Sequence, residues 1–145
     1  MAAGTVGPVS KELKRGMGLT AVLLAATAVF LFFVLFSGSV DVAVEGEKLV
    51  ITTAQWDDMT LDIAAIDSIE YRAEGVDGSR EWGYGSLRLL LGLFRNEEFG
   101  NYTRYTYADT DDCIVLRVGQ KWLIINADGA EATQALYRQI LDAME

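Results

Sequence analysis

The sequence predicts an α+β protein, mostly β, in which one N-terminal transmembrane helix precedes about seven short antiparallel strands and a C-terminal helix. Three observations predict this class. Residues 16–40 contain no charged side chain, as is typical of a membrane-spanning helix. Residues 40–126 alternate repeatedly between apolar and polar side chains, which is the period of a half-buried strand. After Asp128 the apolar residues recur at the spacing of an amphipathic helix.

The membrane helix is predicted over residues 18–38. Residues 19–36 are apolar except for two threonines, and as a helix these 18 residues would rise about 27 Å, close to the hydrocarbon thickness of a bilayer. A buried core helix is not expected, because the roughly 105 residues that follow are too few to cover a helix that is apolar all round.

A cleaved signal peptide is the alternative interpretation of this segment. Lys11, Lys14 and Arg15 form a basic region before it, and the small residues from Ser37 to Ser39 would suit a cleavage site. The apolar run is longer than the roughly 7–15 residues that are usual in signal peptides. An uncleaved signal anchor is therefore favoured.

The charges on the two sides of the span predict its orientation. Three basic residues lie just before it, whereas Lys48 is the only basic residue in the thirty residues that follow. The positive-inside rule therefore places residues 1–17 in the cytoplasm as a tail, and residues 40–145 outside the cytoplasm. The expected location is a cell membrane that the chain crosses once, with the lipid bilayer as a partner of residues 18–38.

The composition of residues 41–145 limits what they bind. These residues include nine Lys or Arg against twenty Asp or Glu, and this charge repels phosphate backbones and anionic headgroups. Nucleic acid and a polybasic lipid patch are therefore disfavoured. The chain has no His and a single Cys, Cys113, so the commonest general base and any internal disulfide are missing. We predict no enzyme, no cofactor, and no catalytic or metal site.

Strand signals begin directly after the span. Residues 40–44 alternate with period two, and residues 48–53 are rich in β-branched side chains, with a turn at 45–47 between them. Residues 59–63 alternate again, and residues 66–72 form the next predicted strand. These segments predict antiparallel neighbours joined by short turns.

The middle of the domain is less regular. Residues 74–86 contain four glycines and are predicted to form a long connection. Residues 87–94 are apolar except for Arg88 and Gly92, and they predict a buried strand with a bulge at Gly92. Residues 101–107 alternate as a further strand.

A hairpin and then a helix are predicted at the C-terminal end. Residues 112–118 and 121–126 flank a two-residue loop that begins with Gly119 and fits a type II′ turn. Asp128 precedes an amphipathic segment of about fifteen residues, and Glu131 follows three residues later, which is the spacing of a capping box.

Glycines and apolar residues of this domain resemble a known family. The residues that carry the resemblance are Gly83, Gly85, Gly92, Phe94, Gly100, Tyr105 and the run Trp122-Leu123-Ile124-Ile125-Asn126-Ala127-Asp128. Over about residues 40–145 they are similar to bacterial PH-like (pleckstrin-homology-like) domains of membrane-associated proteins. The resemblance implies a barrel of about seven antiparallel strands, with two nearly orthogonal sheets and a helix across one open end. It implies no particular biochemical role, since fold does not fix function.

Four side chains in and just after the glycine-rich connection form the candidate partner-binding site. They are Arg80, Trp82, Tyr84 and Arg88. Exposed aromatic and Arg side chains on a loop are typical of a binding hot spot. The alternative is that Trp82 packs over the mouth of the barrel.

Two other groups of residues are expected to have a structural role rather than a binding or catalytic one. Asp109, Asp111 and Asp112 could bind a hard cation, but the loop lacks the further Gly and Glu of a calcium loop, so a solvated turn is favoured. Cys113 begins an apolar run and is predicted to be a small buried side chain rather than a nucleophile.

The expected function is that of a non-catalytic protein-interaction or assembly module, which binds a protein partner or a second copy of itself. The alternative is a module that binds a small ligand or lipid in the mouth of the barrel. A thermal-shift screen separates the two, because a specific ligand raises the melting temperature by mass action.

Overall fold

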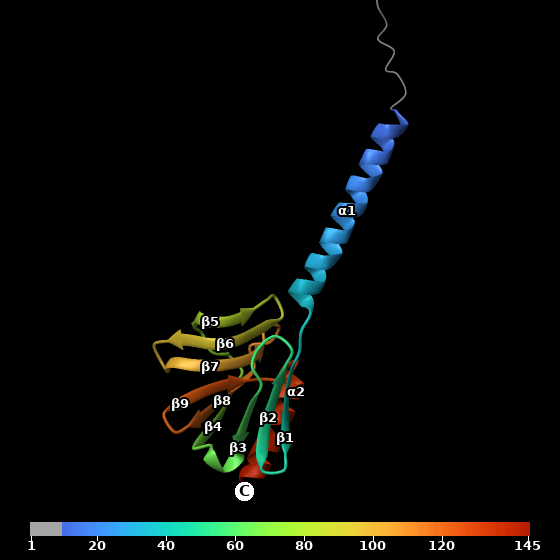
Figure 1. Ribbon diagram of the computed structural model, residues 1–145. Coiled ribbons are helices and arrows are strands. Elements are labelled where there is room, and N and C mark those ends of the chain that lie inside the picture. Colours follow the sequence, from blue (N-terminus) through green and yellow to red (C-terminus); the bar gives the residue numbers. More distant parts are fainter. Residues whose placement is uncertain (1–9) are drawn as a thin grey trace, which may run out of the picture. The chain divides into compact units, whose positions relative to one another are not determined.

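The computed structural model describes residues 10–145 and confirms the α+β class, mostly strands (Figure 1). Nine strands in two sheets lie between an N-terminal and a C-terminal helix. The elements are α1 (Lys11–Phe36), β1 (Val40–Glu45), β2 (Lys48–Thr53), β3 (Met59–Asp62), the short 3-10 helix η1 (Ile63–Ala65), β4 (Ser68–Arg72), β5 (Ser79–Gly85), β6 (Leu89–Asn96), β7 (Gly100–Tyr107), β8 (Cys113–Val118), β9 (Lys121–Ile125) and α2 (Ala130–Met144). The chain divides after Leu35 into a helical unit and a compact β-rich unit.

α1 is long and apolar enough to cross a bilayer. It has 26 residues, and the mean hydropathy of its most apolar 18-residue window is 2.7. The hydroxyls of Thr20 and Thr27 donate hydrogen bonds to carbonyls one turn back, at 2.9 and 2.8 Å, so they need no partner in lipid. The helix begins at Lys11, ahead of the predicted span, and part of the predicted tail, residues 1–9, lies outside the described residues.

The first sheet has the order β1-β2-β3 and is antiparallel, as the alternation of residues 40–63 predicts. Glu45 pairs with Lys48 across a tight turn, and Lys48 also pairs with Asp62 on β3. The chain then turns through η1, where the backbone N–H of Ile63 donates to the carbonyl of Glu47 at 2.9 Å. This bond joins the β1–β2 turn to the end of β3.

The second sheet has six strands in the order β4-β8-β9-β7-β6-β5. Its neighbouring strands are antiparallel except for β7 and β9, which pair in parallel from Thr103–Leu123 to Tyr105–Ile125. The two sheets of the described chain do not close into the barrel that the resemblance implies, so β5 is left as a sheet edge that pairs with β6 alone.

The main core lies between the two sheets and α2. Leu49 and Ile51 of β2, Leu91 of β6, Ile114 of β8 and Ile140 of α2 are all fully buried in this cluster. Alternate residues of the six-stranded sheet point to its other face. A smaller cluster covers that face and consists of Val76, Phe94, Tyr102, Cys113, Val115 and Ile124.

The connection from β4 to β5 is tied to the six-stranded sheet. The guanidinium of Arg104 donates to the carbonyl of Val76 at 2.8 Å. The carbonyl of Asp77 accepts hydrogen bonds from the hydroxyl of Tyr102 at 3.1 Å and the amide of Asn96 at 2.8 Å. The chain can therefore pass from one edge of the sheet to the other while its backbone carbonyls remain bonded.

The prediction of an irregular connection over residues 74–86 is wrong for its second half, which forms β5. Gly83 and Gly92 lie opposite each other on β5 and β6, with φ angles of +140° and +122°. A Cβ atom at Gly83 would lie 2.1 Å from the carbonyl oxygen of Leu91. The glycines that suggested a loop therefore allow two strand backbones to approach closely.

The predicted capping box of α2 is also wrong. Gly129, with φ of +98°, occupies the N-cap position, where no side chain caps the helix. Thr133 lies inside the helix, and its hydroxyl donates to the carbonyl of Gly129 at 2.7 Å and accepts the N–H of Ala127 at 3.1 Å. Asp128 instead accepts a hydrogen bond from Arg88.

Candidate functional site

The β5–β6 hairpin contains all four residues of the predicted site, but their side chains do not lie together on one surface. Trp82 lies opposite Leu93 and Arg80 opposite Phe94, with a register shift between Arg80 and Trp82. Because Leu93 and Phe94 are consecutive, their side chains point to opposite faces of the sheet. Arg80 and Trp82 therefore also lie on opposite faces. The irregularity predicted at Gly92 occurs in β5 instead.

Three apolar side chains are exposed on this hairpin. Trp82 is 72% exposed, Leu93 opposite it is 39% exposed, and Leu87 in the connecting turn is 63% exposed. Outside α1, the described chain has one further large apolar side chain of this exposure, Met144. We call Trp82, Leu87 and Leu93 the hairpin patch. The exposure of Trp82 does not fit the alternative in which it packs over a barrel mouth.

Tyr84 and Arg88 occupy more enclosed positions. Tyr84 pairs with Leu91 and packs, half-buried, against the main core. The Arg88 guanidinium donates to the carboxylate of Asp128 at 3.1 Å and lies 5.3 Å from the ring centroid of Tyr107. Arg88 thus joins the turn of the hairpin to the segment that leads into α2.

The hairpin differs in charge from the rest of the β-rich unit. Residues 79–96 carry Arg80, Arg88 and Arg95 against Glu81 alone. Residues 41–145 as a whole have nine basic and twenty acidic side chains. The exposed apolar patch therefore lies on a basic segment of an acidic domain.

The acidic turn between β7 and β8 holds Asp109, Asp111 and Asp112. Desolvation raises the pKa of Asp109, and a hydrogen bond and the negative charge of Asp128 raise it further. The carboxylate of Asp112 accepts a hydrogen bond from the Tyr71 hydroxyl. Within residues 10–145, no group of three His, Cys, Asp or Glu side chains is placed to hold a metal ion.

Cys113 is buried, as the sequence predicts, with 1% of its surface exposed. Burial raises the pKa of its thiol to about 11. A thiol in this environment stays protonated at neutral pH and is a poor nucleophile.

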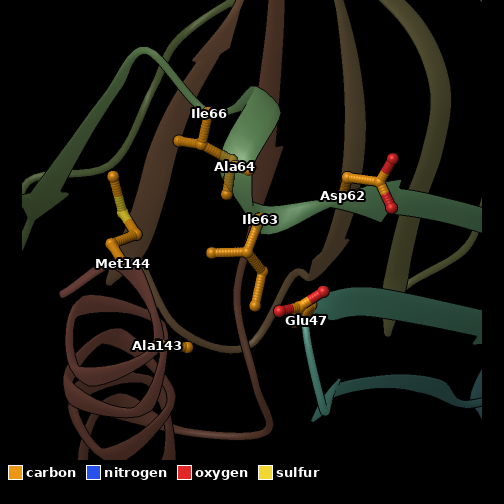
Figure 2. Close-up of a pocket in the computed structure, with 7 residues that line it drawn as sticks. All are labelled: Glu47, Asp62, Ile63, Ala64, Ile66, Ala143 and Met144. Carbon is orange, nitrogen blue, oxygen red and sulfur yellow. The ribbon is translucent and has the colours of Figure 1, made fainter.

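Two hollows of the β-rich unit have no signal in the sequence, because their linings come from separate segments. The first, a pocket of about 510 Å³, is drawn in Figure 2 and is lined by Glu47, Asp62, Ile63, Ala64, Ile66, Ala143 and Met144. The second, of about 250 Å³, is lined by Met59, Thr60, Leu61, Thr103, Val118, Lys121, Trp122 and Leu123. The second lies between β3 and the six-stranded sheet.

A family model described as a bacterial PH domain matches residues 40–140. The chain belongs to the bacterial PH domain family. The matched region of this bacterial PH domain begins with β1, ends within α2 and contains the whole β5–β6 hairpin. No curated protein and no solved structure matches the chain.

Proposed function

We propose that α1 anchors this protein in a membrane and that its bacterial PH domain is a non-catalytic protein-interaction module that docks through the hairpin patch. The observation that carries the proposal is Trp82, which is 72% exposed on an ordered strand beside the exposed Leu93. A Trp side chain kept in water gains more from docking than any smaller apolar side chain.

The composition of the hairpin supports a protein partner. Trp and Arg are the residue types most enriched in interface hot spots, and such residues dominate binding when a rim of other contacts excludes water around them. Arg95, two residues after Leu93 on β6, lies on the face of the hairpin patch, whereas Arg80 lies on the opposite face. A partner with an apolar recess and acidic neighbours would complement this surface.

The alternative, a small ligand or lipid in the mouth between the sheets, has weaker support. The cavity between β3 and the six-stranded sheet is about 250 Å³. Ligand pockets usually measure roughly 300–1,000 Å³, so this cavity is small for a lipid or a cofactor. The pocket of Figure 2, at about 510 Å³, lies within that range but is away from this cavity. The acidic charge of the domain also repels anionic headgroups. A rise in melting temperature with a specific small ligand would favour this alternative.

The test is capture of partners by the full-length chain in its native membranes. After chemical crosslinking, we expect Trp82→Ala to recover at least about tenfold less of the specific partner than the unchanged chain, because hot-spot truncation costs roughly 2 kcal/mol or more. Arg138→Ala, an exposed change on α2, is the matched control and should recover the partner normally. Equal recovery by Trp82→Ala, with an unchanged melting temperature, would rule out the hairpin patch as the docking surface.

A further inference from the structure

A very short segment attaches the β-rich unit to α1. α1 ends at Phe36, and β1 begins at Val40. Gly38 is half-buried on the β-rich unit with φ of +111°, and a Cβ atom there would lie 2.7 Å from the Cδ1 atom of Leu89. The N–H of Val40, which is also buried, donates to the hydroxyl of Tyr107 at 3.1 Å. The attaching segment is therefore packed on the β-rich unit from its second residue onward.

This attachment limits how far the β-rich unit can lie from the bilayer. Two residues of extended chain cover at most about 7 Å, so Gly38 is no farther than that from Phe36, whatever the angle between the two units. With α1 across the bilayer, residues 19–36 fill the hydrocarbon core and Phe36 lies at its edge. The headgroup layer beyond that edge is about 5–7 Å thick. The surface around Gly38 and Leu89 therefore lies in or beside the headgroups.

The β5–β6 turn is the part of the hairpin patch nearest to this point. Leu87 lies two positions before Leu89, so their Cα atoms are at most about 7 Å apart. Figure 1 shows the connection between β5 and β6 beside the segment that leads into β1. Leu93, opposite Trp82, lies four positions after Leu89, which is about 13 Å of strand. Of the three apolar side chains, Leu87 is therefore the one held beside the bilayer.

Leu87 is exposed on an ordered turn. The hydroxyl of Ser86 accepts the N–H groups of Arg88 and Leu89 at 3.1 and 3.0 Å. The carbonyl of Arg88 accepts the N–H of Ala108 at 2.7 Å. These bonds fix the backbone on both sides of Leu87, whose side chain is 63% exposed and belongs to neither hydrophobic cluster.

We propose that Leu87 inserts into the headgroup region of the same bilayer that α1 crosses, and so holds the β5–β6 turn against the membrane. This inference rests on the anchoring part of the proposed function and goes beyond its protein partner. An exposed Leu gains free energy by leaving water, and the short attachment at Gly38 puts the boundary of the acyl chains within its reach. Trp82 and Leu93 stay available, so a protein that docks on them does so beside the membrane.

The charges near the turn distinguish this contact from recognition of headgroup charge. The basic side chain of the turn, Arg88, is paired with Asp128, and Asp109 follows the residue that is bonded to the Arg88 carbonyl. Anionic headgroups are therefore not attracted to this end of the domain. Leu87 should insert in vesicles of zwitterionic phosphatidylcholine alone, without any anionic lipid.

Fluorescence quenching by spin-labelled lipids tests the inference with the full-length chain in phosphatidylcholine vesicles. The reporter is an NBD fluorophore on Ala108→Cys, an exposed position next to the turn that leaves Leu87 in place. Cys113 takes little label because it is buried. We expect lipids with the quencher near the headgroup to quench this reporter. They should quench far less a reporter on Glu97→Cys, in the exposed β6–β7 turn at the other end of β6.

A substitution at Leu87 shows whether this side chain makes the contact. Leu87→Gln keeps a side chain of similar length but makes its insertion unfavourable. It should lower the ratio of inserted to free turns, measured from the quenching, about tenfold. Leu93→Gln is the matched control, because it makes the same change at an exposed Leu farther from the bilayer, and it should leave the ratio unchanged.

Three results would overturn the inference: equal quenching at Ala108→Cys and Glu97→Cys, quenching that Leu87→Gln does not reduce, or quenching that appears only when anionic lipid is added. A reporter on Ala28→Cys, in the middle of α1, separates these failures from failure of the anchor. If lipids with the quencher at the bilayer centre quench Ala28→Cys while the Ala108→Cys reporter is not quenched, α1 crosses the membrane and only the contact of Leu87 is wrong. If neither reporter is quenched, the anchoring part of the proposed function fails.

Discussion

At the scale of single residues, Gly83 is the position where the hairpin tolerates least change. A Cβ atom there would lie 2.1 Å from the backbone oxygen of Leu91, and φ is +140°. Backbone cannot move aside without separating β5 from β6. We therefore expect Gly83→Ala to lower the free energy of unfolding by about 2–4 kcal/mol, combining the cost of a left-handed conformation with that of overpacking.

Gly85→Ala is the matched control for this prediction. The three heavy atoms nearest to its Cβ would all belong to the guanidinium of Arg80, the far end of an exposed and flexible side chain. Denaturant unfolding should show a loss below about 1 kcal/mol. Equal losses in the two variants would mean that the close approach of the two glycines has no energetic role.

Cys113 gives a second prediction at this scale. Its pKa is raised to about 11, and the side chain is almost fully buried. We expect no reaction with an aromatic disulfide reagent at pH 8 in the native protein, and one equivalent of reaction after unfolding in denaturant. Rapid reaction of the native protein would show that this part of the sheet opens locally.

At the scale of elements, Asn126 holds three strand ends together. Its amide nitrogen donates to the carbonyls of Tyr107 and Asp112, each at 3.1 Å, and its oxygen accepts the N–H of Tyr107 at 2.7 Å. The side chain is 1% exposed. It therefore satisfies backbone groups where β7 ends, β8 begins and β9 ends, with no room for water to replace it.

We expect Asn126→Asp to destabilise the protein by about 3–5 kcal/mol at neutral pH, because a buried carboxylate would face two carbonyls. Burial raises the pKa of such a carboxyl, so the folded state binds its proton more tightly. The loss should shrink as the pH falls, since the neutral acid regains one donor. Urea unfolding at several pH values measures this, with Asn101→Asp on the exposed side of β7 as the control. A loss that does not depend on pH would contradict it.

The elements also show what the sequence could and could not predict. β1 to β3, and the hairpin of β8 and β9 with its two-residue loop at Gly119, follow from alternation and turn residues. β5 was not predicted, because glycines are typical of loops. In this strand they instead allow two strand backbones to approach closely. The parallel pairing of β7 with β9 involves segments that are not adjacent in the chain, and local periodicity carries no information about it.

The candidate site could be predicted only in part. The sequence predicted an exposed cluster of aromatic and Arg side chains. Trp82 is exposed, but a bulge places Arg80 on the opposite face. Asp128 looked like a helix cap, yet it binds Arg88, which lies far away in sequence. Leu93 was predicted to be buried with its neighbours, but it lies opposite Trp82 near the edge of the sheet and is 39% exposed.

At the scale of the whole molecule, the prediction concerns which side of the membrane the domain occupies. Lys11, Lys14 and Arg15 lie at the start of α1, and no basic residue lies in its last turn. By the positive-inside rule, a reporter that is active only outside the cytoplasm should be active when fused to Glu145. A reporter that is active only inside is the control. Activity of the control alone would place the domain in the cytoplasm and direct the search for partners there.

The strand order of the larger sheet determines when the domain can be completed during synthesis. β4 leaves the ribosome before β5, β6 and β7, but its partner β8 comes after all three, as in the pairing of Ser68 with Arg117. The β5–β6–β7 meander can form first from local contacts. Until Cys113 and the residues after it emerge, β4 and one side of β7 are unpaired, and such edges readily join another chain. Nascent chains that are synthesised close together are therefore exposed to mispairing until the strands in the last quarter of the protein have been made.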